Sequence, residues 1–426
     1  NLRSLGIFDA VRVETLSDGG TETAAGERRA AVMVTVEEGR YQVLDALLGL
    51  QLDSSPVQTA TTIPVLYTGS LSLRDKNFAG RALEVGLGAN HANRIDAPQD
   101  IEGDFASWEA GPFLKDRRLF GTRLNLNTEL TFRQGRTAQR DAYQQLGRLE
   151  GVVSYDFFNL SYPDRWGQGL RATVSSELRV ERRRGLSVND ERPPFAGVTT
   201  SVDVEPAITW DRRDNPLHPS RGWFASLASQ ALVSVDTQAA ALSFREVFIA
   251  QYVQSFFRNR LIVVPSARVG AIQTDQFEAD LRADFLFKAG GDGVVLPVRG
   301  YADATIDACG GRRRNTWCAD ELPDAGDVVD TIPTVGGRAM ALGSLELRWP
   351  TFLLDDFWFT AFTDVGAVAA DWQAMNPDRF HPSVGGGLRW LVTGQIPLRI
   401  DIAYPLKETV FAPQTARVHF NIFYTL

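Results

Sequence analysis

The segment LRATVSSELRVE, residues 170–181, carries the alternation of side chains that decides the fold of this chain. Apolar side chains (Leu170, Ala172, Val174, Leu178, Val180) alternate with charged and hydroxyl side chains at the positions between them. Period-two alternation is typical of a strand with one apolar and one polar face. In a soluble sandwich the polar face would meet water, whereas in a membrane barrel it would line a wet lumen.

The same alternation recurs from Gly39 to the C-terminus, where helical periodicity is absent. It predicts sixteen strands, near residues 41–52, 63–74, 81–92, 105–115, 121–133, 143–155, 169–182, 198–211, 222–234, 239–255, 260–274, 338–349, 357–369, 383–392, 397–404 and 416–426. An even number is expected of single-chain outer-membrane barrels. We therefore predict an all-β fold, an antiparallel transmembrane β-barrel of about 16 strands over residues 39–426. Its shorter turns are expected at Arg74–Gly80, Asp211–Gly222 and Pro350–Asp356.

Composition agrees with a barrel. Hydrophobic residues make up 44% of the 426 residues, and no apolar run approaches the ~18 residues that a membrane helix needs. A barrel wall can cross a membrane with this composition, because only every second residue faces lipid. The net charge of −8 argues against a nucleic-acid partner. Two basic clusters, 181–184 and 312–314, are either solvated loops or contacts with lipid phosphates.

Residues 1–38 differ from the rest. They predict the end of a helix, a glycine turn and two strands joined by a polar hairpin, Ser17 to Glu27. This α/β fragment is too short to bury a core alone. We expect it to be the end of a separate periplasmic domain.

Five tryptophans lie near the ends of predicted strands: Trp210, Trp223, Trp349, Trp358 and Trp390. That placement is typical of the aromatic girdles at membrane interfaces. Core packing would use tryptophan as well, so both interpretations stay open.

The tetrapeptide Val298-Arg299-Gly300-Tyr301 lies in the longest gap between predicted strands, Asp275–Gly337. A gap of that length is too long for a passive hairpin, and such loops are usually functional or disordered. We expect the loop near residues 275–337 to enter the lumen.

Several motifs, in order, resemble one family. They are WDRRDNPLHPSRGWFASL, FLFKAGGD, VRGY, ALGSLELRWP, FTDVGAV, GGGLRW followed by IPLRIDIAYPL, and VHFNIFYTL. The chain resembles the outer-membrane protein assembly-factor superfamily of BamA- and TamA-type barrels. Residues 1–38 resemble the end of a polypeptide-transport-associated (POTRA) domain. The resemblance implies that the VRGY loop folds into the barrel and that Arg299 contacts acidic residues of the inner wall.

Two carboxylates are candidate partners of Arg299. A guanidinium has five donors and no acceptor, so inside a lumen it requires such a partner. Strand parity places Asp364 and Glu346 on the lumen side of adjacent predicted strands. We expect the motif to hold the loop in place and not to catalyse a reaction.

The resemblance also implies a lateral gate where the first and last strands meet. Candidate gate residues are Leu44, Leu48, Leu50, Phe420, Ile422 and Tyr424. The first strand alternates poorly, since Leu47 and Leu48 are adjacent and Asp45 and Gly49 interrupt it. We expect a short, imperfect ladder that opens and offers an edge to an incoming strand. The alternative is an ordinary closing strand.

Cys309 and Cys318 are the two cysteines of the chain and lie in one polar loop. The pair predicts a disulfide in an oxidising compartment, with two free thiols as the alternative. Two cysteines and four scattered histidines do not make a zinc site.

No nucleophile elbow, P-loop or HExxH motif is present, so we expect no enzyme activity, cofactor or metal. The leading hypothesis is an insertase that assembles β-barrel or autotransporter-like clients in a bacterial-type outer membrane, with the N-terminal domain in the periplasm. Expected partners are unfolded outer-membrane clients, outer-membrane lipids and periplasmic or inner-membrane accessory subunits. A two-partner-type secretion pore and a passive porin are the alternatives.

Overall fold

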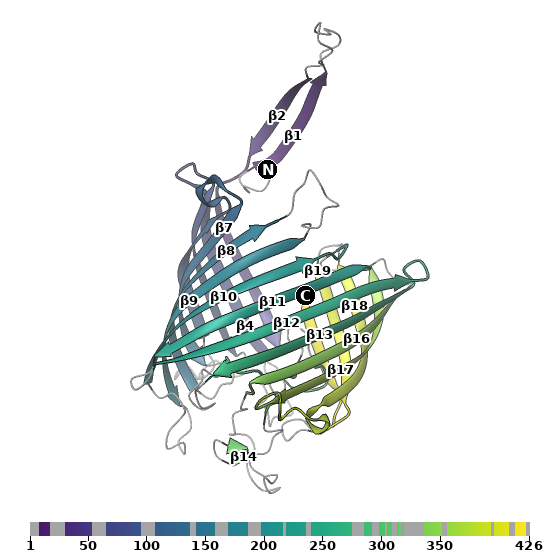
Figure 1. Ribbon diagram of the computed structural model, residues 1–426. Helices are drawn as coiled ribbons and strands as arrows, with labels where there is room; N and C mark the ends of the chain where they lie inside the picture. Colours follow the sequence, from purple (N-terminus) through teal and green to yellow (C-terminus); the bar gives the residue numbers. More distant parts are fainter. Residues whose placement is uncertain are drawn as a thin grey trace.

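A computed structural model describes most of the chain (Figure 1). The described residues are 8–17, 30–52, 65–94, 107–136, 142–157, 169–185, 197–215, 219–235, 240–274, 285–291, 298–302, 305–308, 313–314, 317–318, 336–351, 356–392, 396–408 and 414–422. No helix among them is long and apolar enough to cross a membrane.

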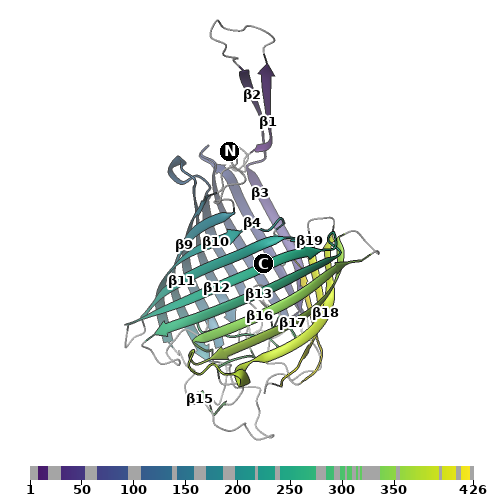
Figure 2. The same ribbon diagram turned by 45° about the vertical axis from the view of Figure 1, so that its right-hand side comes forward.

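Sixteen antiparallel strands form one sheet that curls into a barrel (Figures 1 and 2). They are β3 (Gln42–Leu52), β4 (Val65–Phe78), β5 (Leu83–Arg94), β6 (Ser107–Asp116), β7 (Leu124–Arg136), β8 (Ala142–Asp156), β9 (Leu170–Gly185), β10 (Gly197–Asp211), β11 (Gly222–Val235), β12 (Ala240–Phe256), β13 (Leu261–Thr274), β16 (Ala339–Pro350), β17 (Phe357–Ala369), β18 (His381–Val392), β19 (Ile396–Pro405) and β20 (Arg417–Ile422). Neighbours in the chain are neighbours in the sheet, and β13 pairs directly with β16 across the long loop. The sixteen-strand, all-β prediction is confirmed.

One predicted turn is wrong in its bounds. Residues 74–78 belong to β4, and the turn to β5 is residues 79–82. The side chains explain the difference, because Asp75 and Asn77 accept hydrogen bonds from the backbone N–H groups of Asn77 and Ala82 and so close the turn beyond the strand.

Side chains alternate across the wall as the sequence predicts. On β9, Val174, Leu178 and Val180 are 42–48% exposed on the outer face, whereas Glu181 faces inward and is buried, with a hydrogen bond from Gln144 (2.7 Å). Exposed apolar side chains on the outside and paired polar ones inside are the arrangement of a transmembrane barrel.

The connections at the two ends of the barrel differ. Compact turns such as 79–82 and 257–260 lie at the end that bears the N-terminal hairpin, and the long β13–β16 loop lies at the opposite end (Figures 1 and 2). That loop contains a two-residue ladder, β14 (Arg313–Arg314) with β15 (Trp317–Cys318), where the sequence shows no strand signal. So short a ladder has no alternation to detect.

The N-terminal segment forms an antiparallel hairpin, β1 (Phe8–Ser17) with β2 (Ala30–Glu38), that projects from one end of the barrel (Figure 1). Both strands were predicted. The expected helix end falls in residues 1–7, which lie outside the described residues.

Four of the five tryptophans follow the girdle interpretation. Trp210 and Trp223 stack edge to face on the outer wall (4.8 Å), and Trp390 packs against Phe357 (6.2 Å). Trp349 is 38% exposed. Trp358 instead faces inward and packs against Val253, Ile262 and Val264, because it shares strand parity with the buried Thr360.

Candidate functional site

Parts of the long loop lie inside the barrel and are anchored by apolar contacts. Residues 285–291, 298–302 and 305–308 are joined by isolated bridges, including Ala289–Ile306 and Gly291–Val298. Their buried side chains pack against the inner wall in one cluster, which includes Phe285, Phe287, Val298, Tyr301 and Ile306 of the loop and Ile272, Met340 and Val368 of the wall. The described segments of the loop, between residues 285 and 308, therefore lie against the lumen-facing side of the wall.

Glycines of the wall make room for the loop. A Cβ at Gly270 would lie 2.4 Å from the ring of Phe287, and one at Gly366 would lie 2.6 Å from Val298. Neither glycine needs an unusual backbone conformation. At each position the absence of a side chain lets a loop side chain pack directly against the strand backbone.

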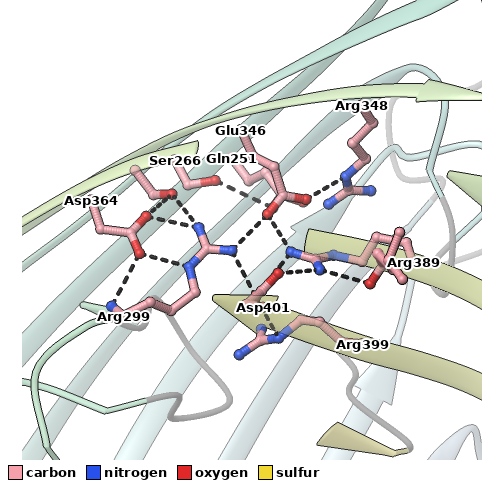
Figure 3. Close-up of polar contacts among 11 residues, drawn as sticks. Gln251, Ser266, Arg299, Glu346, Arg348, Asp364, Arg389, Arg399 and Asp401 are labelled. Carbon is pink, nitrogen blue, oxygen red and sulfur yellow. Dashed lines mark hydrogen bonds and ion pairs between the residues drawn. The ribbon is translucent and has the colours of Figure 1, made fainter. Parts of the chain in front are cut away.

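Arg299 is 2% exposed and is held by carboxylates of the wall (Figure 3). Its Nε and Nη2 donate to the two carboxylate oxygens of Asp364 on β17, at 2.7 and 2.8 Å. Its Nη1 donates to Glu346 on β16 (2.9 Å) and to Asp401 on β19 (3.1 Å). A bidentate arginine–carboxylate pair fixes orientation as well as charge. The VRGY turn is therefore held in one orientation against three strands.

Three further arginines complete the charged cluster. Arg389 of β18 donates to Asp401 (2.6 Å) and to Glu346 (2.7 Å). Arg348 donates to Glu346 (2.6 Å), and Arg399 lies 3.3 Å from Asp401. Four cations thus share three anions in a buried space (Figure 3). Buried charges are tolerated only when they are paired in this way.

An aromatic ring completes the seat of Arg299. The guanidinium lies 3.3 Å from the ring centre of Phe362, a cation–π contact. The ring fits because Gly385 lies beneath it, where a Cβ would come within 2.4 Å. Burial opposes the charge of Arg299, but the hydrogen bonds and charges of Asp364, with Glu346 and Asp401, raise its pKa above the ordinary value. The side chain therefore remains a cation.

Gly300 and Tyr301 tie the loop to the last three strands. The backbone N–H of Gly300 donates to Nε2 of His419 on β20 (3.0 Å), so the neutral ring carries its proton on Nδ1. Gly300 has φ +92°, and a Cβ there would lie 3.1 Å from the Pro405 nitrogen, so both conformation and space require glycine. The Tyr301 hydroxyl donates to the Pro382 carbonyl (2.8 Å), and burial raises the pKa of Tyr301 to about 12.

The structure brings together the predicted trio of Arg299, Asp364 and Glu346. The sequence interpretation missed Asp401 and Arg389 as partners of the cluster, and His419 as the partner of Gly300. In the sequence, Arg399 and Asp401 alternate with Leu398 and Ile400, so the signal for a lumen-facing Asp401 was present. Nothing in the sequence showed that its strand comes within reach of Arg299.

The predicted gate residues lie on the two edge strands of the sheet. Leu44 and Leu48 on β3 are 67% and 89% exposed, and Phe420 on β20 is 45% exposed. Leu50 and Ile422 are placed on these strands by their backbone only, and Tyr424 lies outside the described residues. Between β3 and residues 417–422 of β20 the described backbone forms no ladder. The predicted short ladder would have to involve the last residues of the chain, which are not among those described.

The cysteine prediction is not addressed by the described residues. Cys318 is placed by its backbone in β15, but its side chain and all of Cys309 lie outside them, so the disulfide stays a prediction. Within the described part of the chain, no group of three or more His, Cys, Asp or Glu side chains is arranged to hold a metal ion.

A sixteen-stranded antiparallel barrel with apolar side chains outside and polar side chains inside has the architecture of an outer-membrane β-barrel. The chain belongs to the Omp85 superfamily, since the model of the Omp85 superfamily domain matches residues 77–425. This confirms the resemblance drawn from the VRGY loop and the motifs around it. Barrels of this superfamily are outer-membrane proteins that handle protein substrates.

Solved structures share the fold at low sequence identity. BamA from Haemophilus ducreyi lacking POTRA domains 1–3 superposes with a TM-score of 0.65 and 13% identity, over 99% of this chain and 77% of that one. CdiB from Acinetobacter baumannii gives 0.54 and 10%, over 99% and 66%. CdiB from Escherichia coli gives 0.54 and 13%, over 99% and 70%. No curated protein sequence gives a match.

Proposed function

We propose that this protein is an outer-membrane assembly factor that inserts β-barrel or autotransporter-like clients through an opening between β3 and β20. The proposal includes a periplasmic position for residues 1–38, as the end of a POTRA domain preceding the barrel of residues 39–426. Its partners would be unfolded outer-membrane proteins, membrane lipids and periplasmic or inner-membrane accessory subunits. No catalytic step, cofactor or nucleic acid has a part in it.

The observation that carries the proposal is the pair of edge strands, β3 and β20, which are not joined to each other among the described residues. Every other strand of the sheet has a hydrogen-bonded neighbour on both sides, whereas β3 and β20 end the strand order. A free edge offers unpaired N–H and C=O groups to an incoming strand. Pairing through the main chain accepts many client sequences, as an assembly factor requires.

The contact between the lumen loop and β20 also supports the proposal. The strand β20 pairs with β19 over six residues, Leu398–Ala403 with Arg417–Ile422, among those described. These six pairs are the attachment of β20 to the sheet among the described residues. The bond from Gly300 to His419 adds a second attachment, from the lumen. In this proposal Arg299 is a positioning residue, because it orients the turn that holds β20.

A two-partner-type secretion pore remains the second candidate, because the CdiB barrels share this fold. In such a pore the client would pass through the lumen. The buried loop segments between residues 285 and 308 occupy part of that lumen, so they would have to leave first. The same obstruction speaks against a passive porin.

The proposal is tested by locking the seam. In a background with Cys309→Ser and Cys318→Ser, cysteine pairs are scanned along β3 and β20, starting with Leu48→Cys and Ile422→Cys. The full chain is reconstituted in lipid vesicles, and a urea-unfolded outer-membrane barrel is supplied as client. Insertion is measured by the heat-dependent shift of the client in detergent gels. We expect oxidised pairs to abolish insertion and reduction to restore it.

A matched control locks a ladder that is already formed. Val384 and Tyr404 are register partners on β18 and β19 and both are exposed on the outer face, so Val384→Cys with Tyr404→Cys should leave insertion unchanged. If a fully cross-linked seam still inserts clients, the gate is wrong for this protein. Passage of an unfolded polypeptide through the locked barrel would favour the secretion pore instead.

A further inference from the structure

A groove lies on the outer wall over β6 to β10, toward the end of the barrel far from the N-terminal hairpin. Its volume is about 560 Å³. At its floor the register aligns Phe132 of β7, Gly147 of β8 and Val180 of β9 in one row. Gly147 contributes no side chain to this row, and a Cβ there would meet nothing closer than 3.9 Å. The groove therefore lies where Gly147 leaves a gap between the exposed side chains of Phe132 and Val180.

The groove is apolar on one side of this row, and polar side chains enter it on the other. The next row toward the turn end of β8 and β9 pairs Leu149 with Leu178, which are 43% and 42% exposed. The next row toward the far end contains the polar Gln134, Gln145 and Arg182, with the exposed Trp108 and Val198 at its two ends. The polarity of the outer wall thus changes over one row, as it does where a membrane's hydrocarbon meets its headgroups.

Arg182 is the charged group at this boundary. It faces outward and is exposed, and within the described part of the chain it makes no ion pair or hydrogen bond. The other side of β9 is different, since the adjacent Glu181 faces inward and pairs with Arg179 (2.9 Å). In sequence Arg182 begins a run of three arginines. A guanidinium is well suited to bidentate binding of phosphate.

From this arrangement we propose that the groove binds an anionic phospholipid, with an acyl chain over Gly147 and the phosphate on Arg182. The volume falls within the ~300–1,000 Å³ typical of small-molecule sites. An ordinary stretch of the wall lacks both features: Gly151, four residues along β8, faces Ser176, whose hydroxyl would lie 3.5 Å from a Cβ. The site does not depend on how the seam opens, so it stands apart from the proposed assembly activity.

The test is native mass spectrometry of the full chain in detergent, titrated with phosphatidylglycerol or with phosphatidylcholine. We expect a first binding event that favours phosphatidylglycerol. Arg182→Gln should weaken that event about fivefold and remove the preference, which is about 1 kcal/mol at 1.4 kcal/mol per tenfold. Gly147→Leu should weaken binding of both lipids, because the added side chain fills the groove.

Two controls separate the site from general effects. Gly151→Leu adds the same side chain to the same outer face outside the groove, and Arg258→Gln removes an exposed arginine from a turn at the other end. Both should bind lipid as the unaltered chain does. Equal affinity for the two lipids, or equal effects of Gly147→Leu and Gly151→Leu, would overturn the proposal. So would an Arg182→Gln variant that keeps its preference.

Discussion

Two salt bridges of the same length lie in different parts of the barrel. Arg299 and Asp364 are 2.7 Å apart in the loop-filled part, with side chains 2% and 0% exposed. Arg74 and Asp45 are also 2.7 Å apart, on β4 and β3, but their side chains are 31% and 51% exposed. Exposed pairs contribute about 0–1 kcal/mol, whereas breaking a buried pair costs about 3–5 kcal/mol. Burial, and not distance, distinguishes the stabilising pair from the solvent-exposed pair.

The contrast extends to the two edge strands. His419 of β20 is buried and tied to the loop. On β3, Leu47 shares the lumen-side face of Asp45 and yet is 70% exposed. One edge is therefore attached to the packed part of the barrel, and the other is held mainly by its ladder to β4. We expect β3 to be the edge that moves when the seam opens.

The largest expected effect comes from removing the buried cation. Arg299→Ala leaves Asp364 without its bidentate partner, which should lower the opening free energy of the loop by about 3–5 kcal/mol. Hydrogen exchange of residues 298–302, followed by mass spectrometry, should speed up by more than 100-fold. Arg299→Lys keeps the positive charge but cannot form the bidentate pair. Its exchange rate should therefore lie between those of Arg299→Ala and the unaltered chain. Unchanged exchange in Arg299→Ala would show that the apolar contacts alone hold the loop.

Much of this architecture was readable from the residues. Alternation located most of the sixteen strands, because an apolar outer face and a polar inner face impose period two on a barrel strand. Parity also placed Asp364 and Glu346 on the lumen side. Both results depend only on neighbours along one strand or on adjacent strands.

The missed features depend on the closed barrel. Asp401, on the lumen-facing side of β19, accepts a hydrogen bond from Arg299. His419, on the last strand, accepts one from the backbone N–H of Gly300. Such contacts are set by strand tilt and stagger, which alternation does not encode. Trp358 shows the same limit, since its position near a strand end indicated a girdle while its parity turned it inward.

A smaller effect is expected from cutting the tie between the loop and β20. His419→Ala removes the acceptor of the buried Gly300 N–H, at a cost of about 1–3 kcal/mol. It should loosen β20 and speed cross-linking between Leu48→Cys and Ile422→Cys in the cysteine-free background. His419→Gln offers an amide oxygen to the same N–H and should restore much of the protection. Equal cross-linking rates in all three proteins would mean that β19 alone holds β20.

The smallest effect should come from the exposed carboxylate. Asp45→Ala removes the partner that lies 2.7 Å from Arg74, but Arg74 keeps Glu84 at 3.8 Å, and the side chains of Arg74 and Asp45 are both partly open to solvent. We expect a change in unfolding free energy of at most about 1 kcal/mol, against several for Asp364→Ala. Raising the salt concentration should erase the first difference and not the second, because only exposed charges are well screened. The comparison would be broken if Asp45→Ala destabilised the barrel as much as Asp364→Ala, since burial would then not be what distinguishes the two pairs.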